Sequence, residues 1–437
     1  MGDAIAQSAA EPASFAGKPL RILMPSYRSD PFTGGQGVYM RLVTKALADM
    51  GHTVHVVSGQ PYLVLDPRVI LIKLPSLDLY ARPKGFAGLP WPKREEFRDS
   101  IDVREWLLHV SGAFGEPFTF GERLARWMKS RVADYDVVHD NQTLCWGLLK
   151  IRDMGVPVAG TIHHPITMDR RIAIAHADKL SLKLLIARWY WFLAMQKKVA
   201  RALDPIIVVS ESTKRDVVAD FGLDPSRMVI VYHGIDADIF RPHPEIVRKT
   251  NRLMAVASAD VPLKGLIYLI RAYHQLLATR PDLELLVVGK LREGQTSKLL
   301  DELGIRDKVK FVSSLSSEQI AELYAEATIA VAPSVYEGFG FPPGEAMACG
   351  VPVVVTDGGA LPEVVGDAGI VVPKQNPDAL AHAIGALLDD PARREALGVA
   401  GRKRIHDNFL WSRTARDVTQ VYLKAINANR RSQNARS

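Results

Sequence analysis

The sequence has few cysteines and no apolar stretch long enough to span a bilayer. Only Cys145 and Cys349 occur, which excludes a disulfide framework and gives no metal-binding cysteine pattern. No window holds about 18 uninterrupted apolar residues, so a membrane-spanning helix is not predicted. The first residues lack a basic start and an apolar stretch, so no secretory signal is predicted. These absences fit a reducing, cytoplasmic setting.

The length and the charge distribution narrow the class of protein. At 437 residues the chain exceeds the size at which a single core stops growing, so two domains are predicted. The net charge is +7, and residues 165–201 hold eight Lys or Arg against two Asp, a local excess of +6. A nucleic-acid-binding protein would more often spread such charge along the chain. We therefore predict no nucleic-acid partner and one local anionic partner.

Residues 179–203 are predicted to form one long helix with a basic stripe. At 100° per residue, Lys179, Lys183 and Lys197 fall within roughly 40° of one another, while most of the other side chains are apolar. Such a helix can lie on an anionic membrane surface. It can equally be a core helix with one solvated face, and both interpretations stay open.

The first half of the chain predicts a parallel sheet. Residues 20–25 and 53–58 are typical of short buried strands, and the spacing of apolar residues over 38–50 predicts a helix between them. This order is a βαβ unit, in which ligands bind where the strands end. The loop before the helix ends in Gly34-Gly35-Gln36-Gly37, which is either an anion-binding turn or a flexible link. It lacks the GxGxxG fingerprint, which disfavours a nicotinamide dehydrogenase.

The most informative stretch is 336–355, YEGFGFPPGEAMACGVPVVV. Glu337 and Glu345 stand on either side of a segment rich in glycine and proline, which predicts a loop. A helix beginning near Gly344 or Glu345 would add the positive end of its dipole. The stretch therefore predicts a phosphate-binding turn beside two acids. A loop that only connects a strand to the next helix is the alternative.

This stretch closely resembles the family 4 retaining glycosyltransferases, whose signature is E-x7-E around a G-F-G-x-P turn. The resemblance implies the α/β fold named GT-B, with two Rossmann-like doubly wound domains facing across a cleft. The predicted parts, in chain order, are a disordered lead (1–17), an N-terminal acceptor domain (18–240), a linker (241–251), a C-terminal nucleotide-sugar donor domain (252–408), a helix crossing back to the first domain (409–426) and a disordered tail (427–437).

The resemblance also assigns roles to individual residues. His163 ends a strand in the family's T-x-H pattern, and Lys264 follows a strand where it can reach a diphosphate. The residues implied as catalytic are His163, Glu337 and Lys264. Those implied as donor-binding are Gly35, Gly37, Lys264, Gly338, Phe339, Gly340, Phe341 and Glu345. The sequence departs from the family at Ala259, where an arginine is common, and at His233, where an asparagine is common.

The implied activity is transfer of a hexose-type sugar with retention of its anomeric configuration. The donor would be a UDP- or GDP-linked sugar, and the acceptor a lipid, a saccharide or a small molecule. No metal and no cofactor other than the donor co-substrate are expected, and an anionic membrane surface is a possible partner through 165–201, at the inner membrane face. The alternatives are a sugar-nucleotide epimerase of the same architecture and a non-catalytic nucleotide-sugar binding protein, which the missing arginine at Ala259 would favour.

Overall fold

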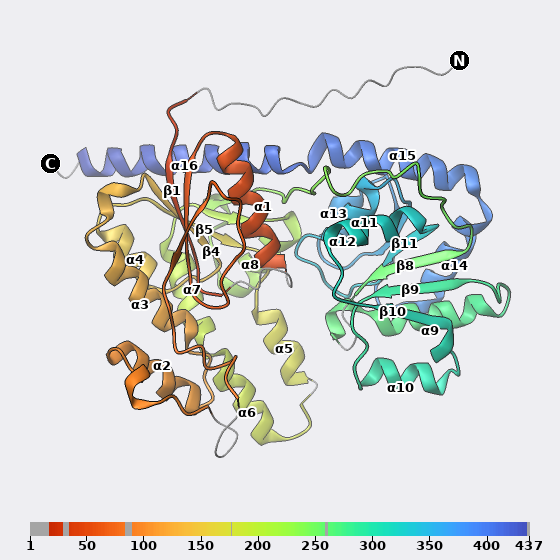
Figure 1. The fold of residues 1–437 in the computed structure, drawn as a ribbon, viewed down its shortest axis with the longest axis horizontal. Coiled ribbons are helices and arrows are strands. Elements are labelled where there is room, and N and C mark those ends of the chain that lie inside the picture. The colour runs from red at the N-terminus through yellow and green to blue at the C-terminus, as the bar shows by residue number, and fades with distance from the viewer. Residues whose placement is uncertain (1–16, 29–34, 84–89, 176, 258–260, 435–437) are drawn as a thin grey trace. The chain divides into compact units, whose positions relative to one another are not determined.

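The computed structural model describes residues 17–28, 35–83, 90–175, 177–257 and 261–434. Its chain divides into two compact units (Figure 1). The described residues of Met1–Val208, Lys214–Val231 and Thr414–Ser437 form the N-terminal unit, and those of Val209–Thr213 and Tyr232–Arg413 form the C-terminal unit. The predicted lead at 1–17 lies almost wholly outside the described residues.

The N-terminal unit is built on a seven-stranded sheet in which every pairing is parallel. Its strands are β1 (Arg21–Ser26), β2 (Thr53–Ser58), β3 (Ile70–Lys73), β4 (Val137–Asn141), β5 (Val158–Ile162), β6 (Ile206–Val208) and β7 (Met228–Ile230). They lie in the order β3-β2-β1-β4-β5-β6-β7. The inner strands are buried along almost their whole length, because helices cover both faces of a parallel sheet. The direction of winding reverses between β1 and β4.

The α-helices of this unit connect the strands and cover the sheet. They are α1 (Gly35–Asp49), α2 (Ser100–Val110), α3 (Glu116–Met128), α4 (Trp146–Asp153), α5 (Thr167–Ala175), α6 (Leu180–Trp189), α7 (Leu193–Ala202) and most of α8 (Glu211–Phe221). The prediction of one helix over 179–203 is wrong, because the 3-10 turn Tyr190–Phe192 separates α6 from α7. In a 3-10 turn, residues three apart point the same way. Trp189 and Phe192 can therefore both pack on Phe114, with ring centroids 5.2 and 5.4 Å away.

The C-terminal unit repeats this architecture with a six-stranded parallel sheet. Its strands are β8 (Arg252–Val256), β9 (Glu284–Val288), β10 (Val309–Val312), β11 (Ile329–Ala332), β12 (Val353–Thr356) and β13 (Ile370–Val372). Its helices are α9 (Leu266–Leu277), α10 (Gln295–Glu302), α11 (Ser317–Glu326), α12 (Phe341–Ala348), α13 (Leu361–Val365), α14 (Pro377–Asp389) and α15 (Pro391–Asn408). The strand order β10-β9-β8-β11-β12-β13 reverses between β8 and β11. Both units are thus doubly wound and Rossmann-like, which confirms the predicted fold class.

The last helix, α16 (Trp411–Asn434), begins in the C-terminal unit and continues in the N-terminal unit from Thr414. It extends well beyond 426, where the sequence predicts a disordered tail. Tyr422 on this helix is fully buried, and Asn429 donates a hydrogen bond to the Gly155 carbonyl at 2.8 Å. These contacts hold its later turns on the unit. Among the described helices, none combines the length and the apolar character that a membrane span requires.

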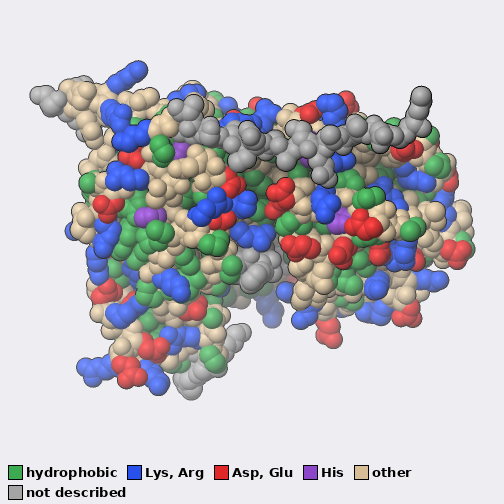
Figure 2. All heavy atoms as spheres, turned by 45° about the horizontal axis from the view of Figure 1, so that its top comes forward, with side chains coloured by type: hydrophobic (Ala, Val, Ile, Leu, Met, Phe, Trp, Pro, Cys, Tyr) green, Lys and Arg blue, Asp and Glu red, His purple; other side chains and the backbone are tan. Residues whose placement is uncertain are grey.

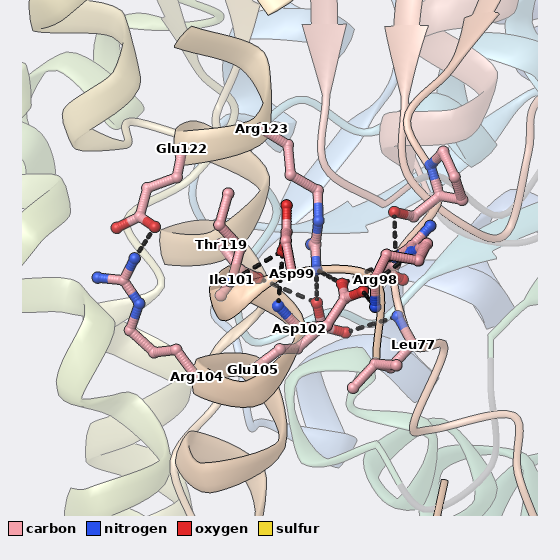
Figure 3. Close-up of polar contacts among 12 residues, drawn as sticks. Leu77, Arg98, Asp99, Ile101, Asp102, Arg104, Glu105, Thr119, Glu122 and Arg123 are labelled. Carbon is pink, nitrogen blue, oxygen red and sulfur yellow. Dashed lines mark hydrogen bonds and ion pairs between the residues drawn. The ribbon is translucent and has the colours of Figure 1, made fainter. Parts of the chain in front are cut away.

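A buried cluster of charges holds α2 against α3 (Figure 3). Asp102 and Glu105 on α2 are almost fully buried, and Arg123 on α3 contacts both carboxylates, at 2.6 and 2.5 Å. Arg98 also pairs with Asp102 at 2.8 Å. Burial alone would raise the pKa of Asp102, but hydrogen bonds from the two arginines lower it to about 2. Asp102 is therefore ionised at neutral pH and depends on these partners.

Arg123→Met is expected to lower the free energy of unfolding by about 2 kcal/mol. The change leaves two buried carboxylates with fewer partners, although Asp102 keeps Arg98 and Glu105 keeps the backbone N–H of Leu77. Denaturant unfolding measures the loss. Arg126→Met is the control, because Arg126 forms an exposed pair with Asp99 and its removal should cost less than about 0.5 kcal/mol. Equal losses in the two variants would contradict the assigned role of the cluster.

Candidate active site

The sheet of the C-terminal unit brings two loops together at the point where its strand order reverses. β8 and β11 are neighbours and run parallel, so their carboxyl ends lie at the same edge. The loop after β8 carries Lys264, and the loop after β11 carries Glu337. Ligands of open α/β sheets bind at such a switch point.

Lys264 and Glu337 form an ion pair at this edge. The Lys264 Nζ donates to Glu337 Oε1 at 2.7 Å, and the Ser334 hydroxyl donates to the same oxygen at 2.8 Å. The Glu337 side chain is 15% exposed and that of Lys264 is 31% exposed, so the ammonium group is the more accessible of the two. An ammonium group has three N–H donors, and only one of them is used by this pair. The cation is therefore placed to contact a second anion.

A glycine allows the two loops to approach so closely. Gly265 has a φ of +61° and is the residue before α9. A Cβ at this position would lie 2.1 Å from the Pro333 carbonyl oxygen in the other loop. Only glycine tolerates both the left-handed conformation and this contact. Gly265 is therefore needed to bring Lys264 beside Glu337.

Helix α12 begins at Phe341, three or four residues earlier than predicted. The sequence places the start near Gly344 or Glu345 because of the two prolines before them. Pro342 and Pro343 instead occupy its first turn, where a missing N–H costs no helical hydrogen bond. Proline has no N–H, so this turn offers an anion the amide of Phe341 and not those of the next two residues. The amide cradle at this helix start is consequently small.

Hydroxyl groups from a distant segment of the chain support the glycine turn before α12. The Ser210 and Thr213 hydroxyls donate to the Gly338 carbonyl at 2.9 and 3.2 Å. Gly340 has a φ of +111°, a left-handed conformation that favours glycine. Phe339 is buried, and Phe341 stacks on the His233 ring with centroids 5.4 Å apart and planes 6° from parallel.

His233, which stands where the family commonly has asparagine, is a buried ring of this support. Burial lowers its pKa to about 3, so the imidazole is neutral at physiological pH. It also packs edge-on against Phe339, with centroids 5.2 Å apart. The histidine at position 233 thus places a ring, in place of an asparagine side chain, against Phe339 and Phe341 of the glycine turn.

Glu345 lies one helical turn after Phe341 and is half-buried. Burial, together with the nearby charge of Asp236, raises the pKa of its carboxyl to about 7. A raised pKa at a ligand-binding edge is typical of functional carboxyls. Glu345 is therefore near half-ionised at neutral pH and separate from the Lys264–Glu337 pair.

The predicted histidine of the N-terminal unit lies beside the switch point of its sheet, one strand away from it. His163 directly follows β5 and is buried. Its Nε2 lies 2.7 Å from Asn141 Oδ1 at the end of β4, and the Asn141 amide donates to Ser26 Oγ at the end of β1. Because that amide oxygen can only accept, His163 Nε2 carries the proton of this contact. The Tyr39 ring packs edge-on against the imidazole, with centroids 4.7 Å apart. His163 is thus fixed in one orientation.

The other predicted residues of this unit lie in a different setting from the one expected. Gly35 and Gly37 belong to the first turn of α1 and not to the loop before it. The first amides of a helix have no helical partner, so the position still suits an anion. His164, the next residue, contacts Asp169 at 2.9 Å. Ala259 lies outside the described residues.

The sequence does not predict Ser334, Asn141 and Tyr39, which orient the predicted residues. Ser334 stands three residues before Glu337, a spacing that allows a local hydrogen bond and could have been noticed. Asn141 and Tyr39 come from separate elements, so their contacts with His163 have no local signal. The described residues contain no group of three or more His, Cys, Asp or Glu side chains arranged to hold a metal ion.

Two doubly wound sheets, each with polar groups at its switch point, define a two-unit α/β protein of the GT-B class. Solved GT-B structures match it in fold. Sucrose-phosphate synthase from Thermosynechococcus elongatus has a TM-score of 0.69 at 23% identity, covering 94% of this chain and 100% of that one. HepE from Anabaena, solved in complex with UDP, has a TM-score of 0.66 at 17% identity, covering 93% and 100%.

Sequence comparisons establish the family. Residues 33–239 match the model of Glycosyltransferase Family 4, and residues 239–404 match that of Glycosyl transferases group 1. The MMP alpha-(1->4)-mannosyltransferase of Mycolicibacterium hassiacum is 46% identical over 93% of this chain and 98% of its own. D-inositol 3-phosphate glycosyltransferase 1 of Catenulispora acidiphila is 31% identical over 72% and 78%. The chain belongs to glycosyltransferase family 4, and the protein is a glycosyltransferase.

Proposed function

We propose that the protein transfers an α-mannosyl residue, with retention, from a UDP- or GDP-linked mannose to a saccharide hydroxyl, forming an α-(1→4) bond. The similarity to the Mycolicibacterium hassiacum mannosyltransferase over nearly the full length of both chains supports the sugar and the linkage. The observation that carries the proposal is the Lys264–Glu337 pair at the switch point of the C-terminal unit. A cation there is suited to a sugar-bearing diphosphate.

The donor is proposed to bind across the edge formed by α9 and α12. Lys264 and the amide of Phe341 stabilise the negative charge that develops on the departing diphosphate. Glu345 accepts hydrogen bonds from the ribose hydroxyls. Glu337 contacts the sugar. Positive charge and amide dipoles take the role that a divalent cation has elsewhere, so the reaction is proposed to need no metal.

The transfer step is proposed to occur on one face of the sugar. The bond between the anomeric carbon and the phosphate oxygen breaks, and its electron pair leaves with the diphosphate. The acceptor oxygen bonds to that carbon on the same face, and its proton passes to the departing phosphate. Double displacement would instead need Glu337 as a nucleophile. Lys264 and Ser334 both hydrogen-bond to Glu337 Oε1, and such bonds reduce its nucleophilicity, which favours the one-face route.

Product analysis tests the proposal. The protein is incubated with UDP- and GDP-linked mannose and glucose, a panel of soluble mannosides, and EDTA, after a thermal-shift screen has selected the donor that raises the melting temperature most. Proton NMR should show a new α-(1→4)-mannosyl linkage, formed at the same rate with and without EDTA. A β-linkage, or an epimerised donor formed without acceptor, would contradict it. The latter result would support the epimerase alternative.

His163→Ala is expected to lower kcat for transfer about tenfold, because a fixed imidazole at the acceptor side orients the reacting groups. The dissociation constant of the donor should stay unchanged. Steady-state kinetics and calorimetric titration separate the two quantities. His164→Ala, which removes the neighbouring histidine, is the control and should keep kcat. A donor affinity that fell with His163→Ala while kcat stayed constant would assign His163 to the donor instead.

The acceptor hydroxyl is proposed to belong to a saccharide, whereas the sequence alone also allows a lipid or a small molecule. Peripheral association with an anionic membrane through 165–201 is likewise proposed. The proposed catalytic and donor-binding residues all lie outside this segment. Membrane association and transfer to a soluble acceptor can therefore be measured independently.

A further inference from the structure

Helix α6 exposes leucines to an extent unusual for a soluble protein. None of its side chains, all of which the structure describes, is buried. Leu180 is 72% exposed and Leu184 is 64% exposed. At 100° per residue, Leu184 and Ala187 lie within about 40° of Leu180, on one side of the helix. These three residues form the outer face of α6.

The opposite side of α6 fixes its orientation on the N-terminal unit. Leu185 packs close to Gly112, where a Cβ would lie 2.7 Å from the leucine Cδ1. Arg188 donates to the Ser111 hydroxyl at 2.6 Å, and Trp189 stacks on Phe114. The helix lies beside the end of α2 (Figure 1). Because these contacts anchor one side, the outer face cannot turn inward to bury its leucines.

Lysines border the outer face on one side. Lys183 lies about 60° from Leu180. Arg188, about 80° from Leu180 on the other side, is held by Ser111 and by the Trp191 ring and belongs to the anchored side. Lys179 precedes the first turn. The ion pairs described for residues 165–201 are His164–Asp169 and Arg171–Asp220, and neither involves Lys179 or Lys183. On the face of the molecule shown in Figure 2, by contrast, blue and red side chains are interspersed.

The neighbouring helix α2 adds a second apolar stripe. Val103, Leu107 and Val110 are 42%, 54% and 38% exposed and follow the i, i+4, i+7 spacing of one helix side. Exposed apolar residues gathered on adjacent helices mark an interaction surface.

We propose that the outer face of α6 docks on an anionic lipid surface. Leu180 and Leu184 enter the boundary between headgroups and acyl chains, while Lys179 and Lys183 contact the lipid phosphates. An apolar stripe bordered by cations is the pattern of helices that lie in the membrane interface. The inference goes beyond the transfer reaction and does not depend on it.

A second copy of the chain fits this face less well than lipid does. A two-fold dimer places the same patch on both subunits, so Lys179 and Lys183 of one outer face would meet those of the other. Like charges brought together in this way oppose association. Lipid phosphates supply the opposite charge.

Vesicle sedimentation tests the proposal with the full chain. Vesicles of phosphatidylcholine containing about 30% phosphatidylglycerol, at about 50 mM salt, should retain the protein, and about 500 mM salt should release most of it. Leu180→Asp combined with Leu184→Asp should lower the partition coefficient at least about tenfold. Lys183→Glu should lower it severalfold. Protein that stays in the supernatant at low salt overturns the proposal.

Matched controls separate docking from general effects. Val247→Asp combined with Val399→Asp replaces two exposed apolar residues of the C-terminal unit and adds the same charge as the leucine variant. Val247 is 86% exposed and Val399 is 67% exposed. This variant should keep most of its vesicle binding. All variants should keep the wild-type melting temperature and the wild-type rate with a soluble acceptor, whatever that rate is. A wild-type dimer in sedimentation velocity that the leucine variant converts to monomer would overturn lipid docking in favour of self-association.

Discussion

Lys264→Ala is expected to lower kcat about 10²- to 10³-fold. Lys264 is the cation at the switch point of the C-terminal unit, and its Nζ contacts Glu337 at 2.7 Å. Removing it takes away stabilisation of the charge that develops on the departing diphosphate, and groups of this kind contribute factors of this size. It also leaves the Glu337 carboxylate without its ion-pair partner. Initial rates at saturating donor and acceptor measure the effect.

Two comparisons distinguish this loss from a folding defect or a general charge effect. Lys298→Ala removes an exposed lysine from α10 in the same unit and should leave kcat unchanged. Circular dichroism and the melting temperature of Lys264→Ala should match those of the wild type to within a few degrees. A Lys264→Ala enzyme that kept its wild-type kcat would remove Lys264 from the proposed mechanism.

Donor affinity is expected to fall as the pH drops through about 7. Burial raises the pKa of Glu345 to about 7 in the unliganded protein. Ribose hydroxyls donate to the ionised carboxylate, so the bound state favours the charged form and has a lower pKa. The contribution of Glu345 to binding is therefore complete about one pH unit above 7 and is lost as the pH falls through 7 and Glu345 becomes protonated, at up to about tenfold in Kd per pH unit. Calorimetric titration between pH 5.5 and about 8.5 measures this slope.

Glu345→Gln provides the matching variant. It should raise the donor Kd about 10- to 100-fold at about pH 8, because hydrogen bonds to a charged acceptor are replaced by weaker neutral ones. It should also remove most of the pH dependence of binding. Glu395→Gln, on an exposed position of α15, is the control and should keep both the affinity and the slope. A pH dependence that persisted in Glu345→Gln would have to come from another group.

The fold was largely predictable because the strands of a doubly wound sheet have a strong local signal. β2 has the predicted limits of 53–58, and β1 lies one residue later than the predicted 20–25, since each is a short, largely apolar segment followed by a loop. Helix ends were less predictable. The sequence places the start of α12 too late because Pro342 and Pro343 resemble helix breakers, although a first turn tolerates both.

Errors elsewhere have similar physical causes. Residues 179–203 have a helical apolar pattern throughout, and the break at Tyr190 arises from packing on Phe114, which is distant in sequence. The late turns of α16 are polar in sequence and are held by contacts such as that of Asn429 with Gly155. Tertiary contacts of this kind leave no local pattern.

The candidate site was predictable in its principal residues but not in their partners. The sequence predicts both Lys264 and Glu337 as site residues, and the structure places them in direct contact. The hydroxyls of Ser210 and Thr213 on the Gly338 carbonyl come from a segment more than a hundred residues away. Such supports follow from the arrangement of the sheet, which only the three-dimensional structure gives.

The central claim is that the edge carrying Lys264, Glu337 and Glu345 binds the sugar-bearing diphosphate on which transfer depends. The most direct test combines Lys264→Ala with Glu345→Ala and follows both transfer and donor hydrolysis by chromatography of the released nucleotide. We predict that the folded double variant shows neither reaction above background. Transfer and hydrolysis that continued at wild-type rates would contradict this account.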